Sequence, residues 1–328
     1  MRVLVTGGAG YIGSVTSNML ADGGHDVLVV DDLSKGHKSA VAGLELAVVN
    51  IEDESAISSA CTRYKPEACM HFAARSLVGE SVAEPLKYFK SNVAGSINLV
   101  RGLVECGCRN LVFSSTAAIY GAPERTPIVE TETPDPVNPY GLTKLMVEWM
   151  LAELALRGAM AYASLRYFNA AGADVDAGLG EDHEPETHLI PRVVFAALGK
   201  EPRASIFGTD YPTPDGTCVR DYIHVSDLAR AHLLALDHLA GGGDGGPFNL
   251  GNGAGFSVRD VIGAVEEVSG REFEVVEEDR RPGDPPVLVA SSERVRSVLG
   301  WKPARPVLRD IVLSAWKWHE AHPDGYQD

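Results

Sequence analysis

Tyr140 and Lys144 stand four residues apart in a segment expected to be helical, so their side chains should share one helical face. A phenol with a pKa of about 10 is a weak base at neutral pH, but a neighbouring cation favours its phenolate form. The pair could therefore transfer a proton. The alternative is a half-buried tyrosine beside a solvated lysine, because this spacing is common in helices.

A glycine-rich turn lies near the amino terminus. Residues 7–13 read Gly-Gly-Ala-Gly-Tyr-Ile-Gly, directly after one predicted strand and at the start of a predicted helix. Such a turn lets a dinucleotide diphosphate approach the helix N-terminus. Asp31, at the end of the second predicted strand, can accept hydrogen bonds from ribose hydroxyls and would repel a 2′-phosphate. The motif thus favours NAD over NADP; a ligand-free turn with a solvated Asp31 is the alternative.

Elements that would position these residues alternate along the first half of the chain. Short β-branched runs predict buried strands, and longer segments with helical periodicity lie between them. The predicted strands are 3–6, 26–30, 46–49, 68–72 and 111–114, and the predicted helices are 13–21, 54–64, 88–106 and 141–156. This order predicts an α/β fold with a Rossmann-type, doubly wound parallel sheet covered on both faces.

The chain length of 328 residues is sufficient for two domains. We expect a dinucleotide-binding domain at 1–170, with a return of the chain at 218–240. The remainder, 171–328, contains more proline and glycine and predicts a smaller α/β domain that carries ligand specificity.

Composition narrows the class of protein. An apolar share of 45% and a charged share of 23% are typical of globular proteins, and a net charge of −16 disfavours nucleic acid and anionic membranes as partners. No apolar run approaches the ~18 residues of a membrane span, and no signal peptide is evident. We therefore expect a cytoplasmic location.

The five cysteines are odd in number and show no C-x-x-C pair, and no His-rich ligand spacing is evident. A disulfide framework or a metal site is not expected.

Further motifs carry a resemblance over nearly the whole chain. They include the run from Phe113 to Gly121 with Thr116 at a strand end, and the segments 71–73, 78–81, 165–169, 208–211, 219–225 and 249–251. With the glycine turn and the Tyr140/Lys144 pair, they resemble the extended short-chain dehydrogenase/reductase superfamily, and within it the UDP-glucose 4-epimerase family.

The resemblance implies a role for each matching residue. Tyr140 would be the acid/base, Thr116 would hydrogen-bond the sugar 4-oxygen, and Lys144 would hold the nicotinamide ribose. The implied NAD contacts are Gly7, Gly10, Tyr11, Ile12, Gly13, Asp31, Asp32, Asn50, Ile51, Phe72, Ala73, Ala74, Asn92, Ser114, Tyr140, Lys144 and Tyr167. The implied UDP-sugar contacts are Thr116, Tyr140, Phe168, Asn169, His188, Leu189, Phe207, Arg220, Arg281, Asp284 and Leu288.

Several positions depart from the family pattern. Thr116 replaces a frequent Ser, Asn50 replaces the usual Asp beside the adenine, and His188 replaces a common Asn. Ser76 stands where a cofactor-contacting Lys is usual, so a cationic contact would have to come from Arg75. We expect the Asn50 amide oxygen to accept the adenine amino group.

The reaction implied is NAD-dependent interconversion of UDP-glucose and UDP-galactose through a 4-keto intermediate. Dehydratase relatives place an Asp-Glu pair where this chain has Ala117 and Ala118, and decarboxylase relatives place a Glu there, which disfavours both reactions. Another nucleotide-sugar epimerase and a non-catalytic NAD-binding protein remain alternatives.

Two further expectations follow from the family. The helices at 88–106 and 141–156 would pair with their copies in a homodimer, since apolar residues occur on more than one face. Leu288 resembles a gatekeeper beside the sugar and would disfavour N-acetylated UDP-sugars; its alternative is a core residue of a strand.

Overall fold

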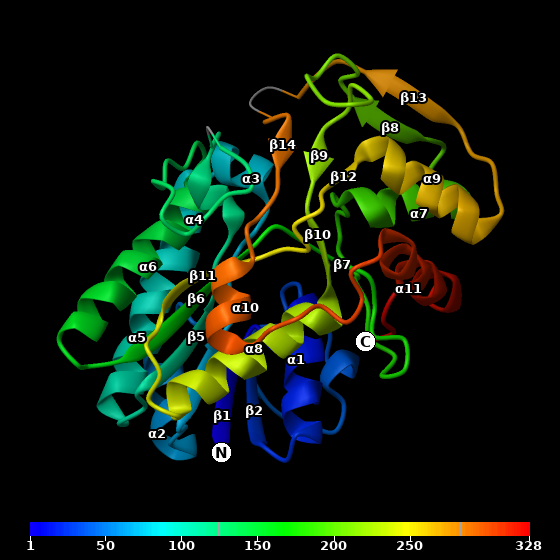
Figure 1. The fold of residues 1–328 in the computed structure, drawn as a ribbon. Helices are drawn as coiled ribbons and strands as arrows, with labels where there is room; N and C mark the ends of the chain where they lie inside the picture. Colours follow the sequence, from blue (N-terminus) through cyan, green and yellow to red (C-terminus); the bar gives the residue numbers. More distant parts are fainter. Residues whose placement is uncertain (124, 282–283) are drawn as a thin grey trace.

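Seven parallel strands form the main sheet of the computed structural model, which describes residues 1–123, 125–281 and 284–328 (Figure 1). Successive side chains of a strand pack into the apolar cores on opposite faces of the sheet. In the first strand, Val3 and Val5 belong to one core and Leu4 belongs to the other. The order across the sheet is β11 (Gly246–Leu250), β6 (Ala161–Tyr167), β5 (Asn110–Ser114), β4 (Ala68–His71), β1 (Arg2–Thr6), β2 (Asp26–Asp31) and β3 (Glu45–Val48). The predicted α/β fold with a doubly wound parallel sheet is confirmed.

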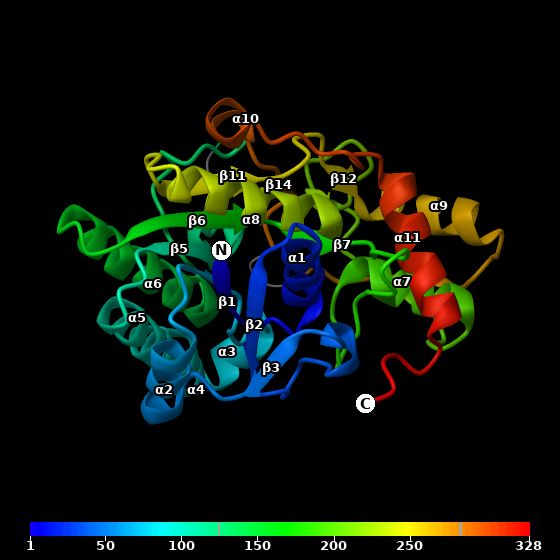
Figure 2. The same ribbon diagram turned by 90° about the horizontal axis from the view of Figure 1, so that it is seen from below.

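Helices cover both faces of this sheet (Figure 2). One face carries α1 (Tyr11–Asp22), α8 (Val225–Ala240) and α10 (Glu293–Leu299), and the other carries α2 (Glu54–Tyr64), α5 (Gly95–Glu105) and α6 (Pro139–Leu156). Each layer buries an apolar core against the strands. The described helices include none that is both long and apolar enough to cross a membrane.

The predicted element bounds agree with the structure to within two residues, except at 88–106. That segment begins with α4 (Pro85–Tyr88), continues as a π-helical turn η2 (Phe89–Ala94) and becomes α5 only at Gly95. The π-helical turn carries the buried Asn92. Such turns occur frequently at functional sites.

A second unit packs three helices around its own core. These are α7 (Leu189–Leu198), α9 (Val258–Ser269) and α11 (Leu308–Ala321). β8 (Ala204–Phe207) pairs with β13 (Val275–Glu278), and β9 (Val219–Arg220) lies between β12 (Phe256–Ser257) and β14 (Val287–Leu288). Shorter elements are η1 (Ser39–Val41), α3 (Val78–Ala83), η3 (Ala117–Tyr120), β7 (Asn169–Ala171) and β10 (Tyr222–His224).

The chain passes between the two units more than once. β7 and β10 pair in parallel where it crosses (Figure 1). After β10, α8 packs on α1, and β11 then pairs with β6 at the edge of the main sheet. The segment that packs on the main sheet thus includes α8 and β11 as far as Leu250.

Candidate active site

The glycine turn joins β1 to α1, and three of its four glycines differ in what surrounds them. A Cβ on Gly7, which has a φ of +69°, would lie 2.4 Å from the Ala73 backbone nitrogen, and one on Gly13 would lie 2.0 Å from the Gly7 carbonyl oxygen. A Cβ on Gly10 would meet nothing closer than 3.5 Å. Packing therefore requires Gly7 and Gly13, whereas a Cβ at Gly10 would make only an ordinary van der Waals contact with the Gly7 carbonyl oxygen.

The N-terminus of α1 fits an anionic ligand. Gly10 is its N-cap and provides no side-chain acceptor for the first N–H groups of the helix. Those donors and the positive end of the helix dipole favour a phosphate group. The absence of a side chain at Gly10 and the uncapped helix together fit the diphosphate of a dinucleotide.

Asp31 ends β2 beside this turn. Its carboxylate accepts hydrogen bonds from the backbone nitrogens of Ala9 at 3.0 Å and Leu33 at 2.9 Å. Burial raises the pKa of Asp31, and these two hydrogen bonds oppose the increase. The carboxylate thus fixes the glycine turn as well as lying at the predicted ribose position.

Asn50 follows β3 close to Asp32. Its side-chain nitrogen donates to Asp32 Oδ2 at 2.8 Å, and its amide oxygen accepts the Glu52 backbone N–H at 2.8 Å. The oxygen expected to accept an adenine amino group is therefore already engaged with the backbone. Ile51 follows in the same loop, at the carboxyl edge of the sheet where ligands of such folds bind.

The loop after β4 contains Phe72, Ala73 and Ala74, and Asn92 holds its continuation in place. Asn92 Oδ1 accepts the Arg75 backbone N–H at 2.8 Å, and its Nδ2 donates to the Arg75 carbonyl oxygen at 3.0 Å and to Thr143 Oγ1 at 3.1 Å. Asn92 thereby links this loop to α6.

The N-terminus of α6 positions Tyr140 and Lys144. Asn138 caps the helix by accepting the Gly141 backbone N–H at 2.8 Å, and Pro139 occupies its first turn. The buried Lys144 Nζ donates to the Ser114 carbonyl oxygen at 2.8 Å and lies 4.9 Å from the centre of the Phe113 ring. Burial lowers the pKa of Lys144 to about 7.

Thr116 reaches the Tyr140 phenol from the other side. It lies just beyond β5 and accepts the Ala118 backbone N–H at 3.1 Å, which starts η3. Burial raises the pKa of Tyr140, and a hydrogen bond with Thr116 lowers it. Tyr167, whose hydroxyl hydrogen-bonds Ser114, lies near the same phenol: burial and then the charge of a Tyr140 phenolate raise the pKa of Tyr167. The structure therefore brings the predicted proton-transfer residues together.

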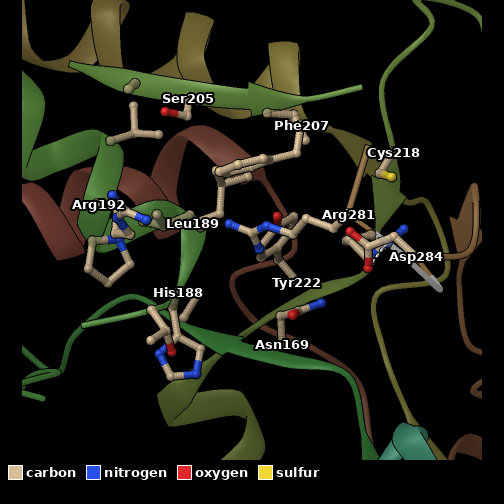
Figure 3. A pocket seen from close by; sticks show the side chains of 18 of the residues that line it. Asn169, His188, Leu189, Arg192, Ser205, Phe207, Cys218, Tyr222, Arg281 and Asp284 are labelled. Atoms are coloured by element: carbon tan, nitrogen blue, oxygen red, sulfur yellow. Dashed lines mark ion pairs between the residues drawn. The ribbon is translucent and has the colours of Figure 1, made fainter. Parts of the chain in front are cut away.

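A cavity of about 210 Å³ lies in the second unit between α7, β8 and β9 (Figure 3). Seven of the predicted substrate residues line it: Asn169, His188, Leu189, Phe207, Arg220, Arg281 and Asp284. Arg220 Nη2 lies 3.4 Å from Asp284 Oδ1, and the Arg281 guanidinium lies 3.8 Å from the centre of the Phe207 ring. Two guanidinium groups near one aromatic wall suit an anionic, ring-containing ligand.

Phe168 and Leu288 do not line this cavity. Both pack against a small apolar cluster that includes Tyr120 and Leu145. Leu288 lies on β14 in register with Arg220 of β9, so it stands between the arginine and the α6 residues. Its packing fits the alternative of a strand core residue and leaves the gatekeeper role a prediction.

Comparison with known proteins places this arrangement in a family. The model of the NAD dependent epimerase/dehydratase family matches residues 3–251. The chain belongs to this family.

Relatives share the family fold over the full chain. A UDP-glucose 4-epimerase of Halalkalibacterium halodurans is 48% identical over 326 residues, which is 99% of this chain and 98% of the relative. The crystal structure of the Brucella ovis UDP-glucose 4-epimerase in complex with NAD has a TM-score of 0.94 at 46% identity, covering 96% of this chain and 97% of that one. The Stenotrophomonas maltophila UDP-glucose-4-epimerase, with bound NAD and formylated UDP-arabinopyranose, has a TM-score of 0.95 at 41% identity, covering 98% and 99%.

One polar network behind the active site of this family member was missed from the sequence. The buried Glu148 carboxylate accepts two hydrogen bonds from Arg166 Nε, at 3.0 and 3.1 Å, and another from the Ser115 hydroxyl. Arg166 also donates to the Tyr120 hydroxyl at 2.8 Å. The i, i+4 spacing of Lys144 and Glu148 was a usable signal, because it places both on one face of the helix.

A second group missed from the sequence surrounds His188. The structure brings Glu181, His183, Glu186 and His188 together, with one ligand atom from each within 4.8 Å of the others. The alternation of acids and histidines from 181 to 188 was the available signal. Their proximity within one loop could not be read from spacing that matches no common metal motif.

Proposed function

We propose that this chain is an NAD-dependent UDP-glucose 4-epimerase that interconverts UDP-glucose and UDP-galactose. One observation carries the proposal: Tyr140 lies near Thr116 and one helical turn from Lys144, and the same chain carries the glycine turn and the arginine-lined cavity. This constellation combines proton transfer, dinucleotide binding and recognition of an anionic substrate. Relatives at 45–48% identity over the full length carry the same activity in their names.

Proton transfer would be the task of Tyr140. Its phenolate form would accept the proton of the sugar 4-hydroxyl, while the Thr116 hydroxyl orients that oxygen. Lys144, held by the Ser114 carbonyl, lies one turn away and would stabilise the phenolate as an ammonium ion. NAD, held at Gly10 and Asp31, supplies the acceptor for the C4 hydride.

Anchoring of the UDP portion would leave the sugar free to rotate within the site. Arg220 and Arg281 would bind the diphosphate, which would compete with Asp284 for Arg220. Asp284 would then be available for the hydroxyls of the uridine ribose. With the nucleotide fixed, the 4-keto sugar could present its opposite face and take the hydride back, with no net change in redox state.

The residues after Thr116 favour epimerisation over elimination. Ala117 and Ala118 begin η3, and their methyl groups can neither donate nor accept a proton. A 4,6-dehydratase needs a further acid and base to remove the C5 proton and expel the 6-hydroxyl. The described active-site residues thus suit oxidation and reduction at C4 alone.

The test is incubation of the purified chain with UDP-galactose, followed by separation of the nucleotide sugars. We expect UDP-glucose to form without an added electron acceptor, and the nucleotide released by denaturation to be NAD. A keto-sugar product would indicate a dehydratase, and NADP in the released fraction would contradict the cofactor assignment. Interconversion of the N-acetylated UDP-sugars alone would favour the alternative of another nucleotide-sugar epimerase.

We also propose a cytoplasmic homodimer formed through α5 and α6. Ile97 on α5 and Trp149 on α6 are 40% and 56% exposed, and Leu86 on the adjoining α4 is 81% exposed. An exposed apolar surface of this kind is typical of protein interfaces. Light scattering should give twice the mass of 35.0 kDa, and Trp149→Glu should shift the protein toward the monomer.

A further inference from the structure

Four side chains converge in the loop that leads into α7. His188 Nδ1 lies 2.8 Å from Glu181 Oε1 and 2.9 Å from Glu186 Oε1. His183 Nδ1 lies 3.1 Å from Glu181 Oε1 and 3.6 Å from Glu186 Oε2. Two imidazole nitrogens thus face two carboxylates.

Burial sets this group apart from a solvated cluster of charges. The side chains of Glu181 and Glu186 are 4% and 5% exposed. His183 Nδ1 and Glu186 Oε2 are buried and make no hydrogen bond of acceptable geometry within the described structure. Buried polar atoms without partners are rare and point to an ion or ligand that satisfies them.

The dimensions of the group match a tetrahedral metal site. Zinc binds histidine nitrogen at about 2.0–2.1 Å and carboxylate oxygen at about 2.0–2.2 Å, so ligand atoms on a tetrahedron lie roughly 3.3 Å apart. The four nitrogen-to-oxygen distances span 2.8 to 3.6 Å around that value. Two carboxylates also neutralise a divalent cation, which reduces the cost of burying it.

We propose that Glu181, His183, Glu186 and His188 bind a divalent transition-metal ion, with zinc as the best match to two nitrogen and two oxygen ligands. Four protein ligands make a closed, structural site rather than a catalytic one. Direct histidine–carboxylate ion pairs without metal are the competing explanation for the same contacts. This inference does not depend on the proposed reaction.

The position of the group gives such an ion a structural role. The His183 ring lies edge-on to the ring of Tyr11, the first residue of α1, with centroids 6.2 Å apart. His188 caps α7 and lines the cavity of the second unit (Figure 3). The ion would therefore fix a loop that contacts both the dinucleotide helix and the substrate cavity.

The test uses the untagged full-length chain after treatment with a chelator. Equilibrium dialysis against zinc, followed by elemental analysis, should give one zinc ion per chain. Cobalt(II) added instead should give the intense visible absorption of a four-coordinate ion, and zinc should abolish it. His183→Ala should weaken zinc binding at least about tenfold, since loss of even an outer-shell partner of a ligand costs that much.

Two controls keep the result interpretable. His238→Ala, which removes a histidine of α8 outside the group, should bind zinc as the wild type does. Glu181→Gln retains the shape of the side chain and should also weaken zinc binding. If the wild type binds no zinc, if cobalt(II) shows only the weak spectrum of a six-coordinate ion, or if His183→Ala and Glu181→Gln bind zinc unchanged, the proposal is wrong.

Discussion

Lys144 Nζ donates a hydrogen bond to the carbonyl oxygen of Ser114 at 2.8 Å, which ties the first turns of α6 to the carboxyl end of β5. Thr116 follows on that strand end, and Tyr140 precedes Lys144 by one turn. A single contact between strand and helix thus sets the relative positions of the residues that would transfer the proton.

Tyr140→Phe should abolish turnover while leaving binding intact. Removal of a positioned acid/base typically lowers the rate by ~10²–10⁴-fold, and the phenyl ring keeps the packing of the phenol. The rate of UDP-glucose formation from UDP-galactose measures the loss, and NAD content and UDP affinity should stay near wild type. Tyr64→Phe, at the far end of α2, is the matched control and should retain full activity. Activity near normal in the Tyr140 variant would remove it from the mechanism.

Gly10→Ala and Gly13→Ala should separate cofactor binding from folding. A Cβ added at Gly10 would lie no closer than 3.5 Å to any other described atom, and Gly10 already has a φ of −79°, so the chain should fold with nearly unchanged stability. The added methyl group should nevertheless displace the diphosphate and lower the NAD content of the purified protein.

Gly13→Ala is the contrasting variant, because its Cβ would lie 2.0 Å from the Gly7 carbonyl oxygen. Overpacking of this kind costs about 1–3 kcal/mol, which urea unfolding would detect. Equal NAD retention by Gly10→Ala and the wild type would count against a diphosphate at this turn.

His232 should make the stability of the protein sensitive to acid. Burial in α8 lowers the pKa of His232 to about 4, and its Nδ1 lies 2.9 Å from the Leu228 carbonyl oxygen. Between that pKa and the unfolded value of about 6.5, the unfolded chain binds more protons, so stability falls as the pH drops through this window. From pH 7 to about 5.5 this histidine alone should contribute a loss of about 1 kcal/mol.

His232→Gln should reduce that loss by about the same amount in urea unfolding experiments at the two pH values. His238→Gln, six residues later in the same helix, controls for the removal of a histidine from α8. An unchanged pH slope in the His232 variant would show that this imidazole is not the group responsible.

Leu288→Gly should widen the range of substrates. Leu288 lies in register with Arg220, and its side chain, like that of Phe168, packs against the cluster near α6. Removal of the isobutyl group would open space for an acetamido substituent, so activity on UDP-N-acetylglucosamine should rise relative to UDP-glucose. Val287→Gly, the neighbour on β14, controls for general loss of stability. If both variants keep the wild-type preference, Leu288 is not the gatekeeper.

Five of the seven strands of the main sheet were predicted, and β6 and β11 were missed; four of the five, β1, β2, β4 and β5, are buried almost throughout. Such strands appear in the sequence as short apolar runs, and the helices between them show clear periodicity. The strands of the second unit were not predictable in the same way, since β9, β12 and β14 have two residues each and carry no periodic pattern.

The site was predictable where one motif contains all its chemistry, as with the glycine turn or Tyr140 and Lys144. Contacts between distant segments could not be predicted, because sequence spacing does not encode which loops meet. The ion pair of Arg220 with Asp284, 64 positions apart, is an example. The hydrogen bond to the Asn50 side-chain oxygen was missed as well, although it is local, since the donor is the Glu52 backbone N–H two residues later.

The return of α8 and β11 to the main sheet also sets an order for synthesis and folding. β11 forms the outer partner of β6, and α8 packs on α1, yet both are made only after α7, β8 and β9 of the second unit have been translated. A nascent chain ending near residue 170 exposes the edge of β6 and the apolar surface that α8 covers. Unpaired strand edges and uncovered apolar surfaces promote aggregation, so this part of the main sheet is protected only once α8 and β11 have been made and have packed on it.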